Sequence, residues 1–239
     1  MRKKISKSIL QLLTISSLLF FPLAAQAQTA QIEKDIKKAT EVKDTRFYRG
    51  TSIGLEIAGI GSHLLGSDIF NTEIQAQANL LNRFFPVFEI GMGKADTTND
   101  GTDIHYKTSA PYFRIGMDYN FLYQKPHLPG ILLGGIRYGF SSFDYDVEAP
   151  TMTDPNFGGT TDVPFSYLGQ KCTAHWLEAV VGLKVKIYKG FCMGWSCRYK
   201  RKMSLSKDEN TRPWYIPGFG KNSSGSFNLS YHLIYNLPF

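Results

Sequence analysis

Large apolar side chains occupy every second position in the last thirteen residues of the chain, from Phe227 to Phe239. Most of the positions between them are polar, as at Asn228, Ser230 and His232. Because successive side chains of a β-strand point to opposite faces, this spacing predicts a strand with one apolar and one polar face. One face of this strand suits contact with lipid, and the other does not.

The same alternation recurs in seven earlier segments, separated by clusters of Gly, Pro, Asn and Asp. Their apolar positions contain no charged residue. The segments are 53–57, 74–80, 88–92, 113–121, 132–140, 177–187 and 191–199. Eight alternating segments predict an all-β fold, a transmembrane antiparallel up-and-down β-barrel of about eight strands. No apolar run after residue 27 reaches the roughly 20 residues of a membrane helix, and alternation keeps the mean hydropathy low.

The opposite phase of these segments carries charges and glycines. Its charged members include Glu56, Glu73, Glu89, Arg114, Asp118, Arg137, Glu178, Lys184 and Arg198. A lipid-facing Arg or Lys at the bilayer midplane costs about 2–4 kcal/mol, which predicts that this phase faces the lumen. Side chains fill the narrow lumen of an eight-stranded barrel, and unpaired buried charge is heavily penalised. The sequence therefore predicts a plug of ion pairs, with a selectivity ring or proton path as the alternative.

The connections alternate in length, and this pattern predicts the topology. Residues 82–84, 124–130 and 188–190 form short connections, whereas 59–70, 96–103, 148–170 and 206–222 form longer ones. In outer-membrane barrels the short turns face the periplasm and the long loops face outward. In the fifth segment the apolar phase changes from Phe140 to Phe143, which predicts a β-bulge or the point where the strand leaves the membrane.

The N-terminal residues have the features of a secretory signal peptide, predicted as residues 1–27. Residues 28–48 are predicted to form a periplasmic tether, and residues 49–239 the barrel. Arg2, Lys3, Lys4 and Lys7 supply four of the +7 formal charges, which leaves about +3 for the mature chain. Such a small net charge with no basic cluster gives no indication of nucleic-acid binding.

Candidate chemistry is sparse. Ser230 and His232 share one face of the last strand, and Glu56 would lie on the neighbouring first strand after closure, so a lipid-modifying site of the lipid A acyl hydrolase or transferase type is one alternative. No Ser stands in a nucleophile-elbow motif. The five histidines and three cysteines lack ligand spacing, so neither a metal nor a cofactor is expected.

Aromatic residues mark the last long connection as a candidate contact surface. Trp214, Tyr215 and Phe219 lie within residues 206–222. Exposed aromatic side chains on an outward loop would bind a ligand or partner. The alternative is that they fold down as a lid over the barrel mouth.

Several segments together resemble a small outer-membrane β-barrel family of unknown function from Gram-negative bacteria, with an eight-stranded architecture of the OmpA and OmpX type. They are residues 110–120, 174–184 and 215–219 and the terminal strand. The terminal strand also resembles the signal that such barrels present to the barrel-assembly machinery, carried here by Tyr231, Leu233, Tyr235, Leu237 and Phe239. The resemblance implies a fold and an outer-membrane location, and no catalytic or ligand residues.

The sequence therefore predicts a non-enzymatic, monomeric outer-membrane barrel of the cell envelope with a filled lumen. Its surface loops would bind a partner or the barrel would support membrane integrity, in contact with outer-membrane lipid and lipopolysaccharide. A lipid-modifying enzyme and a narrow small-solute channel are the alternatives.

Overall fold

A computed structural model describes residues 46–125, 128–149, 165–206 and 211–238. The predicted signal peptide, all but the last three residues of the predicted tether, and Phe239 lie outside the described residues. No helix in the described ranges is long and apolar enough to cross a membrane.

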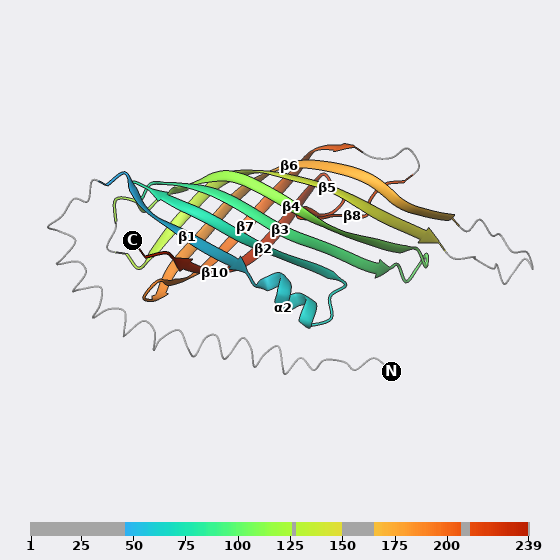
Figure 1. The fold of residues 1–239 in the computed structure, drawn as a ribbon, viewed down its shortest axis with the longest axis horizontal. Helices are drawn as coiled ribbons and strands as arrows, with labels where there is room; N and C mark the ends of the chain where they lie inside the picture. The colour runs from blue at the N-terminus through green and yellow to red at the C-terminus, as the bar shows by residue number, and fades with distance from the viewer. Residues whose placement is uncertain (1–45, 126–127, 150–164, 207–210, 239) are drawn as a thin grey trace, which may run out of the picture. The chain divides into compact units, whose positions relative to one another are not determined.

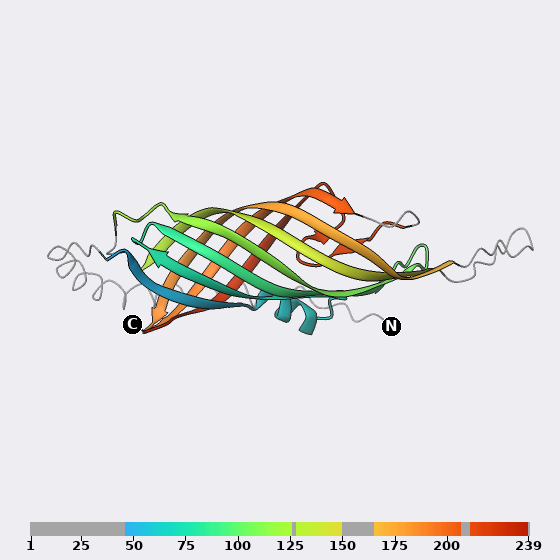
Figure 2. The ribbon, with the colours of Figure 1, turned by 45° about the horizontal axis from the view of Figure 1, so that its top comes forward.

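Eight antiparallel strands close into a barrel, as the alternation predicts (Figures 1 and 2). The strands of the wall are β1 (Tyr48–Glu56), β2 (Ile69–Leu80), β3 (Phe84–Thr98), β4 (His105–Asn120), β5 (Gly130–Ala149), β6 (Phe165–Tyr188), β7 (Phe191–Ser206) and β10 (Gly225–Asn236). Each strand pairs with its neighbours in sequence, and β1 pairs with β10 to complete the ring. The up-and-down topology follows from these pairings.

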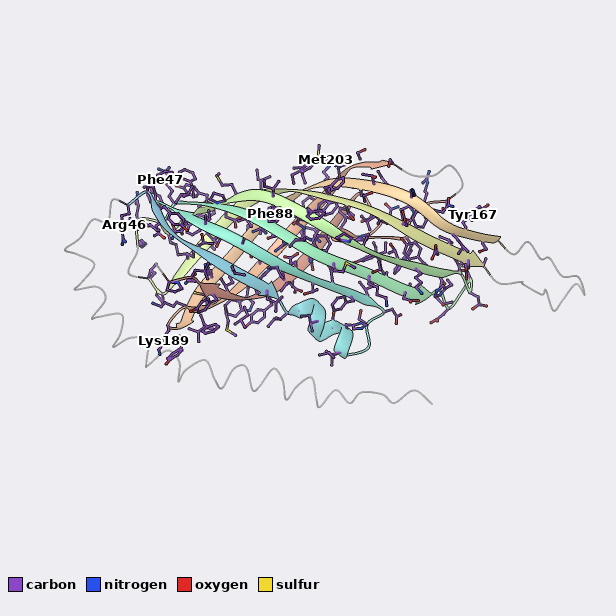
Figure 3. The ribbon with its side chains drawn as sticks, in the orientation of Figure 1. Arg46, Phe47, Phe88, Tyr167, Lys189 and Met203 are labelled. Atoms are coloured by element: carbon purple, nitrogen blue, oxygen red, sulfur yellow. The ribbon has the colours of Figure 1, made fainter. Side chains whose placement is uncertain are left out.

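Short and long connections lie at opposite ends of the barrel. Among the described residues, 81–83, 121–124 and 189–190 lie at the turn end, whereas 57–68, 99–104 and 211–224 lie at the loop end. The two-residue turn Lys189-Gly190 gives Lys189 a φ of +44°, a left-handed conformation that tight hairpins require. In Figure 3, Lys189 and Tyr167 lie near the two opposite ends of the barrel.

Burial alternates along the strands. Outward apolar side chains such as Ile115, Ile136 and Val181 are 62%, 66% and 58% exposed, whereas inward residues are mostly buried. A continuous exposed apolar surface of this kind marks contact with a membrane or partner. At the turn end the interior is mixed: apolar Phe85, Val87, Leu133, Cys192 and Ile234 are buried there beside polar Ser52, Gln77, Asn120 and Lys184.

The phase change in the fifth segment does not come from a β-bulge at that point. The pairing of β5 with β4 keeps one register from Tyr112–Ser141 to Thr108–Tyr145, so odd residues face inward throughout. Phe143 and Tyr145 are therefore buried in the interior, 3% and 1% exposed. The apolar residues change face here because the interior of the barrel becomes apolar and aromatic toward the loop end.

Two small elements lie between the strands of the wall. Helix α2 (Ala58–Leu64) follows β1 and lies beside the start of β2 (Figure 1). Strands β8 (Tyr215–Ile216) and β9 (Gly220–Lys221) form a short hairpin in the last long connection. The alternating pattern predicts neither element, because both are short and their apolar positions have no strand period.

Candidate functional site

Seven charged side chains from six strands meet in the middle of the lumen. We call them the lumen cluster: Glu73, Glu89, Arg114, Asp118, Arg137, Glu178 and Arg198. Their side chains are at most 3% exposed. The strand period and the barrel closure bring them together, since each lies in the inward phase of its own strand. The structure thus places seven of the nine predicted network residues in one ion-paired group.

Each arginine bridges at least two carboxylates. The guanidinium of Arg198 lies 2.7 Å from Glu73 and 2.9 Å from Glu89. Arg137 lies 3.0 Å from Asp118 and 3.1 Å from Glu89. Arg114 lies 2.8 Å from Glu178 and 3.0 Å from Glu89, and also contacts Glu73. The planar guanidinium has several donors in fixed directions, so arginine suits a position between several carboxylates.

Neutral donors add hydrogen bonds to the carboxylates. The hydroxyl of Tyr112 donates to Glu73 over 3.0 Å, and the indole Nε1 of Trp176 donates to Glu178 over 2.6 Å. The amide of Gln77 donates to Asp118 over 3.2 Å. Buried charge is tolerated when it is paired and hydrogen-bonded, and these contacts supply most of that bonding. The Oδ1 of Asp118 and the Oε2 of Glu178 are buried and accept no hydrogen bond from the described residues.

One further buried cation balances the charge of the cluster. Four carboxylates face three arginines, and Lys200, which is 1% exposed, supplies a fourth positive charge from β7. Its ammonium donates to the carbonyl oxygen of Gly218 over 2.7 Å and to that of Phe219 over 3.4 Å. Lys200 therefore connects the ionic interior to the last long connection of the chain.

That connection folds down into the loop end of the barrel as a lid, which we define as residues 213–221. Arg114 donates from its Nη2 to the carbonyl of Gly218 over 2.8 Å, and Tyr106 donates to the carbonyl of Tyr215 over 2.7 Å. Gly218 has a φ of +79°, and a Cβ added there would lie 2.4 Å from the ring of Tyr112. Only glycine fits at this position.

The lid shares an aromatic core with the strands. Its Tyr215, Ile216 and Phe219 are buried with Tyr106, Tyr112, Phe143, Tyr145 and Trp176. Tyr215 and Phe219 are 2% and 1% exposed, so they do not lie at the surface, and the structure has the lid that the sequence left as the alternative. Apolar burial inside the barrel stabilises them there. Burial raises the pKa of Tyr215 to about 12. Trp214 keeps 39% of its surface exposed.

Two predicted network residues lie outside the ion pairs. The carboxylate of Glu56 accepts hydrogen bonds from the backbone N–H of Ala58 over 2.9 Å and of Gly59 over 3.1 Å. It satisfies the first N–H groups of α2, which lack partners within the helix. Lys184 lies nearer the turn end, and its ammonium donates to the hydroxyl of Ser52 over 3.0 Å. No carboxylate in the described residues lies within ion-pair distance of Lys184.

Ser230 and His232 face the lumen from β10, and the pairing of β1 with β10 sets Glu56 opposite His232. The ring Nε2 of His232 lies 3.1 Å from Glu73, and the carboxylate of Glu56 is turned toward α2. No hydrogen bond joins Ser230 to His232 among the described residues. The geometry therefore joins His232 to the lumen cluster and leaves Ser230 without a base.

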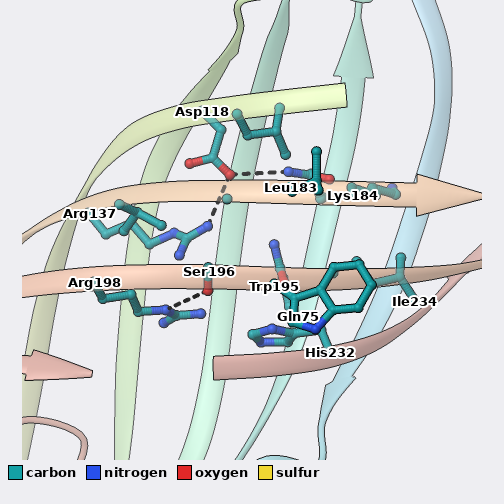
Figure 4. Close-up of a pocket in the computed structure, with 15 residues that line it drawn as sticks. Gln75, Asp118, Arg137, Leu183, Lys184, Trp195, Ser196, Arg198, His232 and Ile234 are labelled. Atoms are coloured by element: carbon teal, nitrogen blue, oxygen red, sulfur yellow. Dashed lines mark hydrogen bonds and ion pairs between the residues drawn. The ribbon is translucent and has the colours of Figure 1, made fainter. Parts of the chain in front are cut away.

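Little open space remains around the cluster on its turn-end side. A cavity of about 40 Å³ lies there, lined by Asp118, Arg137 and Arg198 together with Gln75 and His232 (Figure 4). Such a volume holds one to a few water molecules. Within the described ranges no group of three or more His, Cys, Asp or Glu side chains is arranged to hold a metal ion.

Sequence reasoning missed the residues that connect the cluster to the lid. Tyr112 and Trp176 lie at the inward-facing alternate positions of their strands. Their odd or even position, which we call parity, could therefore have placed them in the lumen. Gly93 leaves room for Pro217, because a Cβ on Gly93 would lie 2.8 Å from Cα of Pro217. No local pattern indicates that contact, since the two residues belong to distant segments.

Several solved structures are similar to this barrel. A major outer membrane protein from Thermus thermophilus aligns over 79% of this chain and 100% of its own, with 12% identity and a TM-score of 0.43. Neisserial surface protein A aligns over 80% and 98%, with 14% identity and a TM-score of 0.40. The attachment invasion locus protein of Yersinia pestis aligns over 78% and 97%, with 11% identity and a TM-score of 0.37.

Comparison with curated proteins found no match to the sequence. A family described as "Domain of unknown function (DUF6048)" matches residues 5–239, which is nearly the whole chain. The chain therefore belongs to the DUF6048 family.

Proposed function

We propose that this protein is a non-enzymatic outer-membrane β-barrel of a Gram-negative cell envelope that acts through its extracellular end. The band of exposed apolar side chains around a closed barrel supports a place in a membrane. The loop end then faces outward, because long loops of such barrels are extracellular. The N-terminal segment, with the features of a secretory signal peptide, supports export.

The filled lumen is the observation that carries this proposal. Three layers occupy it: the apolar and polar side chains near the turn end, the lumen cluster in the middle and the lid at the loop end. Eight strands enclose little more than their own side chains. A barrel filled in this way supports surface binding over transport.

A surface pocket beside the lid is the best candidate for a contact with a partner. It has a volume of about 570 Å³ and is lined by Lys202, Arg212, Trp214, Asn222 and neighbouring residues. Lys202 hydrogen-bonds Asn222, and the ammonium of Lys221 lies 5.3 Å from the ring centre of Trp214. Two basic side chains and an exposed indole suit an anionic glycan, because arginine and lysine bind sulfate or phosphate and an indole face packs on a sugar ring.

Binding of dextran sulfate to cells that display the barrel tests this function. We expect saturable binding that weakens with added salt and falls at least fivefold on Arg212→Ala and on Trp214→Ala, because each change removes a contact of the pocket. Neutral dextran serves as the ligand control.

The matched protein control is Lys171→Ala, which removes an exposed base from β6 outside the pocket. Heat-modifiable migration on gels checks that each variant remains a folded barrel. Equal binding by the Lys171→Ala and Arg212→Ala proteins would contradict the pocket as the contact.

A further inference from the structure

The barrel wall has a side opening where β1 ends early. β1 pairs with β10 only from Ser52–Asn236 to Glu56–His232, and its pairing with β2 ends at Leu55–Ile74. Toward the loop end, residues 225–231 of β10 pair with β7 alone, and residues 69–73 of β2 pair with β3 alone. Helix α2 lies at this gap, where the N–H of Ile57 donates to the carbonyl of Tyr231 over 2.9 Å.

A cavity of about 420 Å³ lies behind the opening, and we call it the seam cavity. Small-molecule sites commonly have volumes of about 300–1,000 Å³. Residues of α2, β2, β10 and the lid line it. It is separate from the pocket at Trp214, because no residue of that pocket lines the seam cavity.

Polar groups without partners line the seam cavity. The hydroxyl of Tyr215 is buried and has no hydrogen-bond partner in the described residues. The Oδ1 of Asn71 is also buried and accepts no hydrogen bond from them. Ser62, Ser67, Ser226, Ser230 and Asn228 add further hydrogen-bonding side chains. A buried polar group that lacks a partner costs about 1–3 kcal/mol, so these groups favour a ligand that supplies donors and acceptors.

The charges that line the cavity are already engaged. Glu73 belongs to the lumen cluster, Glu56 accepts from the backbone of α2, and Lys200 donates to two lid carbonyls. Lys221 lies over the ring of Trp214. Two carboxylates and two ammonium groups line the cavity, so it does not present one sign of charge to a charged head group. Hydroxyl groups match its serine and asparagine side chains.

The edge of the opening is strongly apolar. Phe227 and Leu229 line the seam cavity from β10, and each is 76% exposed. On α2, Leu64 is 81% exposed, and Leu65, which follows the helix, is 89% exposed. The ring of Phe227 packs on Tyr199 at 4.8 Å between centroids, an aromatic pair of the kind that marks a membrane interface. A hydrocarbon chain at this edge would cover side chains that the fold leaves bare.

We infer that the seam cavity binds one amphiphile with an uncharged, hydroxyl-rich head group, a neutral glycolipid. The head group hydrogen-bonds Ser230, Asn71 and Tyr215, and the acyl chain lies along Phe227 and Leu229 outside the wall. This inference rests on the proposed place of the barrel in a membrane and is independent of binding at the surface pocket that Trp214 lines.

Native mass spectrometry with dodecyl maltoside as the probe tests this inference. We expect one retained molecule per wild-type barrel, and at least a tenfold smaller retained fraction for Ser230→Leu, which fills the cavity from β10. The matched control is Ser142→Leu, at an exposed site on β5, which should retain the probe like the wild type.

Variants that lose heat-modifiable migration are replaced by Asn228→Leu, which alters the same wall of the cavity from a half-buried position. Equal retention by a folded cavity variant and by Ser142→Leu would overturn the site. Two further probes test the ligand class. Maltose alone and dodecylphosphocholine should each be retained at least tenfold less than dodecyl maltoside. Equal retention of maltose would show that the hydrocarbon chain does not contribute to binding. Equal retention of dodecylphosphocholine would show that the site does not select an uncharged head group.

Discussion

Replacing Arg114 by methionine is expected to destabilise the barrel by about 3–5 kcal/mol, the range observed when one partner of a buried ion pair is removed. Arg114 contacts Glu73, Glu89 and Glu178 and donates to the carbonyl of Gly218. Without the positive charge of Arg114, less positive charge offsets the repulsion among the three buried carboxylates. Urea unfolding of the protein in lipid vesicles, followed by tryptophan fluorescence, measures the effect.

An exposed ion pair on the same barrel supplies the control. Lys107 lies 3.8 Å from Asp96, and both side chains are more than a third exposed. We expect Lys107→Met to cost less than about 1 kcal/mol, because water screens the pair. The double variant Arg114→Met, Glu73→Gln should recover part of the loss, because it removes one uncompensated charge. Similar stability of the Arg114→Met and Lys107→Met proteins would show that the cluster does not stabilise the fold.

Replacing Gly218 by alanine is expected to release the lid. A left-handed backbone costs a residue with a Cβ about 1–2 kcal/mol, and here the Cβ would also meet the ring of Tyr112 at 2.4 Å. Undocking would break the hydrogen bonds from Arg114 and Lys200 to the carbonyl of Gly218. Chymotrypsin should then cut after Tyr215 or Phe219 at least ten times faster than in the wild type, where both side chains are buried.

Gly101→Ala is the matched control for the lid. Gly101 lies in another connection at the loop end, has no left-handed φ, and the nearest atom to an added Cβ is the Asn99 side chain at 3.4 Å. This change should leave cleavage in the lid at the wild-type rate. If Gly218→Ala and Gly101→Ala are cut equally slowly, the lid does not depend on the close contact at Gly218.

The strand period made most of the barrel predictable. Alternation identifies all eight wall strands, because one face of each strand must suit lipid and the other the lumen. The same parity places Glu73, Glu89, Arg114 and Arg198 inside, and a narrow closed barrel then brings them within contact distance. Parity does not indicate how far along the barrel axis a side chain lies, and that position decides whether a charged side chain contacts the lumen cluster. Lys184 therefore faces inward without an ion pair among the described residues.

The sequence left the lid as one of two alternatives and did not indicate α2, because the positions of both depend on long-range contacts. Nothing near Pro217 in the sequence indicates Gly93 as its neighbour. The early end of β1 diverts Glu56 from the ion pairs to the backbone of α2, and the alternating pattern does not show where β1 stops. Phe143 and Tyr145 lie at odd, inward-facing positions of β5. Their neighbours in the interior include lid residues, and the sequence of one strand does not indicate that contact.

Single-channel recording in planar bilayers tests the closed lumen most directly. A lumen that is occupied by the side chains near the turn end, the lumen cluster and the lid should give no steady channel of porin size with the purified wild-type barrel. Heat-modifiable migration of the same preparation confirms that the protein is folded. Steady, long-lived open channels from that preparation would contradict the filled lumen and with it the proposal that this protein acts at its surface.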